Sequence, residues 1–245
     1  MEKREIIHDG VSIKIYGTED PEKVIISFTD DITAYNKIKK AVIQDKGIYC
    51  NGVSCMVSRL LQDGGVPTHF IEQLSPREQL CWKSDVIPME VIVRNVIAGS
   101  MAQRLGLQEG MIPKDTVFDL CYKSDALCDP IINDYHALAL DLVTREDLDA
   151  IYAMTRKVNG ILAPVFRSIG ITLVDFKIEF GHLSDGRLVM SDDITPDSAR
   201  FWDIETGNKL DKDRFRHDRG HVGDAYKTVY ERLKTAFRPG ECPLS

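Results

Sequence analysis

The chain has 245 residues, of which 43% are hydrophobic and 28% are charged, and its formal net charge is −7. This composition excludes a disordered chain, the acidic balance argues against non-specific nucleic-acid binding, and no apolar run approaches the ~20 residues that span a bilayer. Residues 1–10 lack the apolar core of a signal peptide, so we expect a cytoplasmic protein that enters no membrane and binds no nucleic acid.

The first 85 residues contain several strand-like segments. Residues 12–16 and 23–28 are separated by the turn-forming segment GTEDPE and predict two strands. Residues 55–65 predict a short helix that ends at glycine, and residues 66–73 and 79–83 predict two further strands. The six cysteines form no CxxC pair, which favours idle thiols over a structural zinc site.

A second region begins at residue 86. Apolar residues at spacings of three and four predict a long helix over 145–169. Residues 173–181 and 186–193 predict a β-hairpin, and 221–237 predict a closing amphipathic helix. Together these elements predict an α+β protein with two lobes, a β-rich N-terminal lobe over 1–85 and a mixed α/β lobe over 86–245, with a binding site in the cleft between them.

The segment LVDFKIEF, residues 173–180, has a charged side chain at every second position. Because successive side chains on a strand point to opposite faces, Asp175, Lys177 and Glu179 share one face. A solvated face with cross-strand ion pairs would explain the pattern. The alternative is the floor of a binding site, in which Lys177 holds an anion and a carboxylate holds a metal ion.

Two basic segments could bind an anion. In residues 86–106, Arg94 precedes an Ala-Gly-Ser segment in which Ser100 can cap a helix, and the free N–H groups could bind a phosphate, although a simple helix cap explains the serine as well. In LDKDRFR, residues 210–216, alternating charge is typical of a solvated face, but one lysine and two arginines could also hold an anionic substrate.

The acidic segment SDDITPDSAR, residues 191–200, follows the predicted hairpin. Pairing of the two hairpin strands would bring Asp192 and Asp193 close to Glu179. Two carboxylates at that distance repel each other unless a cation lies between them, and hard oxygen ligands suit Mg²⁺, which usually also takes phosphate oxygens and water. An acidic turn or a helix start is the alternative interpretation.

Two long segments and several shorter ones resemble one known family. IPMEVIVRNVIAGS and LVDFKIEFG are similar to signature segments of the phosphoribosylaminoimidazole-succinocarboxamide synthase (SAICAR synthetase) family, and PTHFIEQLS, DPIINDYH, ITPDSARFWD and LDKDRFR are similar to it in the same order and spacing. The resemblance extends from about Gly10 to the closing helix. It implies the two-lobed fold of that family, with an ATP lobe related in shape to that of protein kinases, and a homo-oligomer.

The resemblance implies an ATP-dependent ligase that joins L-aspartate to carboxyaminoimidazole ribotide, forming SAICAR in de novo purine biosynthesis. The γ-phosphoryl group of ATP would move to the ribotide carboxylate, and the aspartate amine would attack the acyl phosphate, with Mg²⁺ offsetting the charge of the phosphates. Two alternatives are a divergent ligase acting on another amine or carboxylate in a nucleoside pathway, and a non-catalytic ribotide-binding protein.

The resemblance also implies roles for particular residues. The catalytic positions are Lys177, Asp175 and Arg94, with Asp175 orienting Lys177 or a metal-bound water. The nucleotide would contact Gly10, Lys14, Val86 in the hinge-like segment Asp85–Pro88, Lys177, Glu179 and Asp192. The metal ligands would be Glu179, Asp192 and Asp129. The substrate would contact Arg94, Ser100, Asp129, Asp197, Arg200, Lys212 and Arg216.

The N-terminal loop departs from the family. It reads GVSIKIY where the family usually reads close to G-K-A-K-x-V-Y, so Val11 and Ile13 replace two lysines that face the ATP phosphates. The loss should weaken phosphate binding by about 1–3 kcal/mol for each lysine if both were desolvated. Lys37, which stands where glycine is usual, and the nearby Lys39 and Lys40 could restore some of this charge.

Overall fold

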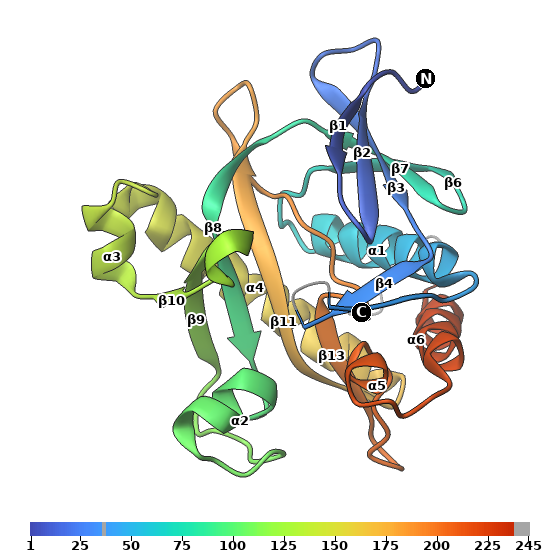
Figure 1. Ribbon diagram of the computed structural model, residues 1–245. Helices are drawn as coiled ribbons and strands as arrows, with labels where there is room; N and C mark the ends of the chain where they lie inside the picture. Colours follow the sequence, from blue (N-terminus) through green and yellow to red (C-terminus); the bar gives the residue numbers. More distant parts are fainter. Residues whose placement is uncertain (36–37, 238–245) are drawn as a thin grey trace.

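The computed structural model describes residues 1–35 and 38–237 (Figure 1). Lys37 and Cys242 lie outside the described residues. The N-terminal part contains a five-stranded antiparallel sheet in the order β1-β2-β3-β7-β6, and a separate two-stranded sheet of β4 and β5. The strands are β1 (Ile6–Asp9), β2 (Ile13–Gly17), β3 (Lys23–Phe28), β4 (Asp31–Ala34), β5 (Lys39–Val42), β6 (Phe70–Ser75) and β7 (Glu78–Trp82).

Helix α1 (Lys46–Asp63) lies against the five-stranded sheet and against the C-terminal helix α6 (Val222–Ala236). It begins nine residues before the predicted start at residue 55, so that prediction is wrong. Its first half contains two glycines and several small polar residues, and shows no amphipathic period. Most of its side chains are nevertheless buried, because α1 is enclosed on several sides, and burial outweighs weak local helix propensity.

The C-terminal part contains a second antiparallel sheet in the order β10-β9-β8-β11-β12, with β13 also paired to β11. In Figure 1, β11 runs through the centre of the molecule between β8 and β13. The remaining elements are β8 (Asp85–Arg94), α2 (Gly99–Leu105), β9 (Val117–Tyr122), the 3-10 helix η1 (Asp125–Leu127), β10 (Ile131–Ile132), α3 (Asp134–Ala139), α4 (Arg145–Ser168), β11 (Ile171–His182), β12 (Leu188–Met190), β13 (Ala199–Asp203) and α5 (Asp213–Arg216).

A single large apolar core joins the two parts of the chain. It includes Ile26 of β3, Val57 of α1, Phe166 of α4, Ile178 of β11 and Val229 of α6. The predicted long helix and hairpin are present as α4 and as β11 with β12, and the predicted α+β class is confirmed. The boundary after residue 85 coincides with the start of β8, and the division into two lobes at that point stays a prediction. None of the helices in the described ranges is long and apolar enough to cross a membrane.

The two faces of β11 differ as the sequence predicts. Phe176, Ile178 and Phe180 pack into the core, and Lys177 and Glu179 lie together on the opposite face, with Nζ of Lys177 3.4 Å from Oε1 of Glu179. The hairpin to β12 ends where the N–H of Ser191 donates to the carbonyl of Glu179 at 2.9 Å. The acidic loop that follows therefore crosses the charged face of β11.

Candidate active site

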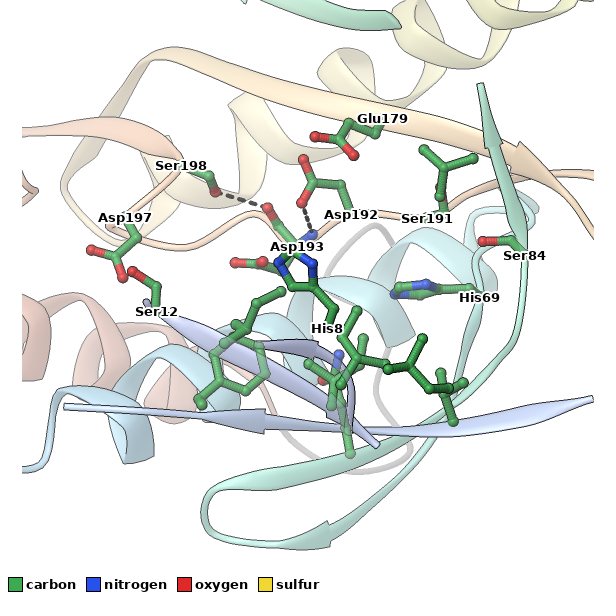
Figure 2. Close-up of a pocket in the computed structure, with 18 of the residues that line it drawn as sticks. His8, Ser12, His69, Ser84, Glu179, Ser191, Asp192, Asp193, Asp197 and Ser198 are labelled. Atoms are coloured by element: carbon green, nitrogen blue, oxygen red, sulfur yellow. Dashed lines mark hydrogen bonds between the residues drawn. The ribbon is translucent and has the colours of Figure 1, made fainter. Parts of the chain in front are cut away.

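A cavity of about 530 Å³ lies between the first sheet and the charged face of β11. Residues from both sides of position 85 line it, as expected of a site in the cleft between the two parts. Its roof, formed by β1, β2 and β3, is largely apolar: Ile7, Ile13, Ile15, Val24, Ile26 and Phe28. Its floor carries most of the charged groups: Lys123, Lys177, Glu179, Asp192, Asp193, Asp197 and Lys212. The four acidic residues of this set are labelled in Figure 2.

The acidic part of the floor is centred on Glu179 and Asp192. Oδ1 of Asp192 accepts the backbone N–H of Asp193 at 2.8 Å, whereas Oδ2 is buried and has no hydrogen-bond partner among the described residues. Burial, and then the charge of Glu179, raise the pKa of Asp192 well above its ordinary value. Figure 2 shows the Asp192 side chain pointing toward Glu179. A cation bound between the two carboxylates would offset the repulsion between them and would give the buried oxygen of Asp192 a partner.

Two lysines hold the acidic groups from either side. Lys123, directly after β9, forms an ion pair with Glu179. Nζ of Lys177 lies 2.7 Å from Oε2 of Glu90 on the neighbouring strand β8. Desolvation lowers the pKa of Lys177, but the carboxylates of Asp192, Glu90 and Glu179 outweigh it and raise the pKa above its ordinary value. Lys177 therefore stays protonated at neutral pH.

The residues that could hold a metal ion are few. Within residues 1–35 and 38–237, no group of three or more Asp, Glu, His or Cys side chains is arranged to bind a metal ion. Mg²⁺ in nucleotide sites usually takes only one or two protein carboxylates and completes its shell with phosphate oxygens and water. Glu179 and Asp192, with one buried unpartnered oxygen, fit that requirement.

A network of arginines and carboxylates lies beside the cavity floor. Asp175 is buried between two guanidinium groups, with Oδ2 2.8 Å from Nη1 of Arg200 and 3.5 Å from Nη1 of Arg94. Arg94 is also paired with Asp119 at 2.7 Å, and Nε of Arg200 lies 2.7 Å from Asp213. The structure therefore places Asp175 differently from the expectation that it orients Lys177, which is held by Glu90 and Glu179 instead.

Ser100 belongs to the same network, but it does not cap a helix. Helix α2 begins at Gly99, its N-cap is Ala98, and no side chain caps it, so the predicted cap is wrong. The hydroxyl of Ser100 instead accepts a hydrogen bond from Nη2 of Arg94 at 3.3 Å. Ser100 lies two positions beyond the N-cap Ala98, so its oxygen is not placed to accept the first free N–H groups of the helix.

The other end of the cavity is built around Asp197. Its Oδ2 lies 2.5 Å from Nζ of the fully buried Lys46, and its Oδ1 accepts a hydrogen bond from the Tyr226 hydroxyl at 2.8 Å. Lys212 lines the cavity next to it, and burial lowers the pKa of Lys212 despite the nearby carboxylate of Asp197. Arg216 pairs with Asp213 at 2.6 Å and thereby joins the arginine network.

The structure brings together most of the residues expected at the site. Val86, Lys177, Glu179, Asp192, Asp197 and Lys212 line the cavity, and Arg94, Ser100, Asp175, Arg200 and Arg216 form the adjacent network. Gly10, Lys14 and Asp129 are not among the residues that line the cavity.

Lys14 lies between two inward-pointing isoleucines of β2 and pairs with Asp9 at 2.8 Å. The carboxylate of Asp129 accepts the N–H of Ser124 at 2.8 Å. Lys39 pairs with Asp218 at 2.6 Å rather than lining the cavity.

Sequence reasoning missed Lys46, Lys123, His69 and His8. Lys46 is the first residue of a helix that was expected to begin later, and Lys123 directly follows a strand that was not predicted. His69 is buried and faces the cavity, where desolvation lowers its pKa to about 4. No local pattern marks any of these four side chains as facing the site, although His69 lies within a predicted strand, and pairing of distant segments is the signal that could have found them.

Comparison with known proteins agrees with this geometry. The family model described as SAICAR synthetase matches residues 6–233. A phosphoribosylaminoimidazole-succinocarboxamide synthase of Clostridium beijerinckii is 53% identical over 233 residues, which cover 95% of this chain and 99% of that protein.

Solved structures agree as well. The crystal structure of phosphoribosylaminoimidazole-succinocarboxamide synthase from Ehrlichia chaffeensis matches with a TM-score of 0.92 at 40% identity, covering 96% of this chain and 100% of that chain. A SAICAR synthetase in complex with ADP matches with a TM-score of 0.91 at 41% identity, covering 94% and 98%. The chain therefore belongs to the SAICAR synthetase family and is an ATP-dependent ligase of purine biosynthesis.

Proposed function

We propose that the cavity binds the nucleotide of the ligase reaction, with the base near Val86 and the phosphates above Lys177 and Glu179. The apolar roof suits a flat base and a ribose, and the charged floor suits phosphates. A volume of about 530 Å³ lies within the range of small-molecule sites. The related SAICAR synthetase in complex with ADP supports a nucleotide at a site of this fold.

Glu179 and Asp192 would hold Mg²⁺ in this proposal. The observation that carries it is the buried, unpartnered Oδ2 of Asp192 beside the carboxylate of Glu179. Mg²⁺, when bound, offsets the charge of the transferring phosphoryl group. Lys177 would place a second positive charge next to the same phosphates, and Glu90 and Glu179 hold its ammonium group in position.

The arginine network would bind carboxyaminoimidazole ribotide. Asp175 and Asp213 engage Nη1 and Nε of Arg200, so these carboxylates fix the plane of the guanidinium group. A guanidinium group has five N–H donors, and those on Nη2 are suited to a phosphate. Arg94 and Ser100 would complete this pocket, and Lys212 beside Asp197 would face the carboxylates of the second substrate, L-aspartate.

These positions suit the reaction that the family resemblance implies. The ribotide carboxylate is a poor electrophile, because its leaving group would be oxide, and transfer of the γ-phosphoryl group from ATP gives it a phosphate leaving group. The L-aspartate amine then attacks the acyl phosphate, the new C–N bond forms, and phosphate leaves. The chain's part is to hold the ribotide carboxylate in line with the γ-phosphate and to stabilise the transferring charge through Lys177.

The test is a reaction with purified protein, Mg·ATP, carboxyaminoimidazole ribotide and L-aspartate. We expect ADP and SAICAR in equal amounts. Glu179→Gln should lower Mg²⁺-dependent turnover by about 10²-fold or more, the scale of losing one electrostatic partner of the reacting group, and should leave ribotide binding intact. Glu205→Gln, at an exposed turn, is the control and should match the unchanged protein.

Other outcomes would contradict the proposal in different ways. Unchanged turnover in Glu179→Gln would remove Glu179 from the metal site. ADP release only with another amine would identify a divergent ligase. Ribotide binding without any ADP would indicate a non-catalytic protein. The homo-oligomer and the role of Asp129 stay predictions that these reactions do not address.

A further inference from the structure

The roof of the cavity is poor in positive charge. Strands β1 and β2 and the turn between them contribute the lining residues Ile7, His8, Ser12, Ile13 and Ile15. His8 is the member of this set whose side chain can become positively charged. Lys14 on β2 points to the other face of the strand and pairs with Asp9. Nucleotide phosphates carry several negative charges, so a cation on the roof would attract them strongly.

The turn between β1 and β2 holds the His8 ring at the cavity. Figure 2 shows the ring extending into the cavity toward the loop that carries Asp192 and Asp193. Gly10 makes this possible, because a Cβ atom at Gly10 would lie 2.8 Å from Nε2 of His8 and 2.7 Å from the carbonyl oxygen of Ile13. A larger residue at position 10 would displace the ring or open the turn.

We propose that protonated His8 binds the nucleotide phosphates from the roof, so that this chain binds its nucleotide more tightly as the pH falls from 8 to 6. The inference rests on the proposed nucleotide site. The other charged and titratable side chains that line the cavity are those of His69, Lys83, Lys123, Lys177, Glu179, Asp192, Asp193, Asp197 and Lys212. The lining of β2 and β3 adds no charged side chain to these.

Proton linkage sets the size of the expected effect. Histidine ordinarily changes its charge between pH 5 and 8. If phosphate prefers the protonated imidazolium form of the ring, nucleotide binding is coupled to the uptake of a proton. A rise of one pKa unit in the ring on binding corresponds to a tenfold higher affinity for the protonated form than for the neutral form. His69 does not contribute in this range, because desolvation lowers its pKa to about 4. The pH dependence of nucleotide affinity between pH 6 and 8 therefore tests His8, once the contribution of the other titratable groups has been subtracted.

The experiment measures the affinity for ADP by calorimetry at fixed Mg²⁺ and pH 6, 7 and 8, for the unchanged chain, His8→Gln and His8→Lys. His8 is exposed on β1, so both variants should fold, which circular dichroism checks. From pH 6 to 8 the unchanged chain should lose about five- to tenfold more affinity than His8→Gln. His8→Lys should bind more tightly than His8→Gln at pH 8 and share its pH profile.

Each outcome decides a separate point. Equal pH profiles for the unchanged chain and His8→Gln would overturn the role of His8 and leave the nucleotide site intact. Failure of the unchanged chain to bind ADP at any pH would overturn both. The titration of the His8 ring, followed by NMR with and without ADP, gives a direct readout, since bound phosphate should keep the ring protonated to higher pH. An identical titration with and without ADP would contradict the contact.

Discussion

Replacing Lys46 with methionine removes the charge that neutralises a buried carboxylate. Lys46 is fully buried, its Nζ lies 2.5 Å from Oδ2 of Asp197, and Tyr226 donates to the other oxygen of the same carboxylate. Methionine keeps an unbranched apolar stem, so little cavity forms. Breaking a buried ion pair by removing one partner leaves an uncompensated charge and costs about 3–5 kcal/mol.

The loss can be measured by urea unfolding and by calorimetry. In a domain of this size, 1 kcal/mol corresponds to about 2–4 °C in Tm, so we expect Lys46→Met to lower Tm by about 6–20 °C. Burial acts to raise the pKa of Asp197, but Lys46 and then Lys212 outweigh it and hold the pKa below its ordinary value. Without Lys46 that pKa rises, so the penalty should be largest near pH 7–8 and should shrink toward pH 4 as the carboxyl becomes protonated.

Two controls make this reasoning refutable. Arg187→Met breaks the exposed pair with Asp185, which solvent screens, and should cost far less than Lys46→Met. In the double variant Lys46→Met with Asp197→Asn, the remaining group is neutral, and part of the stability should return. A loss below about 1 kcal/mol for Lys46→Met, or a double variant equal to the sum of the single losses, would show that the pair is not energetically coupled.

Two further changes test other parts of the molecule. Gly99→Ala should cost about 2 kcal/mol or more in urea unfolding, because φ is +53° and the added Cβ would lie 2.3 Å from Nη2 of Arg200. Gly106→Ala, at φ +63° with open space around it, should cost only about 1 kcal/mol, and equal losses would show that Arg200 moves freely. Desolvation lowers the pKa of His69 from 6.5 to about 4 in the folded state. As the pH falls, the unfolded chain therefore protonates His69 before the folded chain does. The free energy of unfolding should fall by about 2–3 kcal/mol between pH 7 and 4.5 for this reason. His69→Gln should lose less over that range, and an equal loss would contradict the assignment.

Local patterns predicted those parts of the fold in which one strand or helix faces both core and solvent. Strand β3 has the predicted bounds Lys23–Phe28, and the apolar stripe of α4 and the alternation of β11 follow the burial that they predicted. Helix α1 was predicted too short, because buried glycine and polar residues carry no period. Its first residue, Lys46, is fully buried and forms the ion pair with Asp197, which lines the cavity, so the error in the helix start also hid a residue next to the site.

The residues of the candidate site also divide into those that a local sequence pattern predicted and those that it did not. Glu179 and Asp192 could be placed together because Asp192 directly follows the hairpin that carries Glu179, and a hairpin register follows from its turn. Lys123 directly follows β9 and His69 directly precedes β6, and no short segment indicates that they lie near Glu179. Lys14 is the opposite case. The family motif gives its position in the sequence, but the register of β2 decides on which face of the strand its side chain lies.

In the proposed function, the polar face of β11 would bring the two binding sites next to each other. Asp175 lies opposite Arg94 in the pairing with β8 and next to Arg200 of β13, so it belongs to the arginine network. Lys177 and Glu179, two and four residues further along, belong to the acidic floor of the cavity. Residues at that spacing on one face lie about 7 Å apart per step. Direct phosphoryl transfer requires the donor and the acceptor to be held in contact, and if β11 carries ligands for both, as we propose, this one strand would set the distance between them.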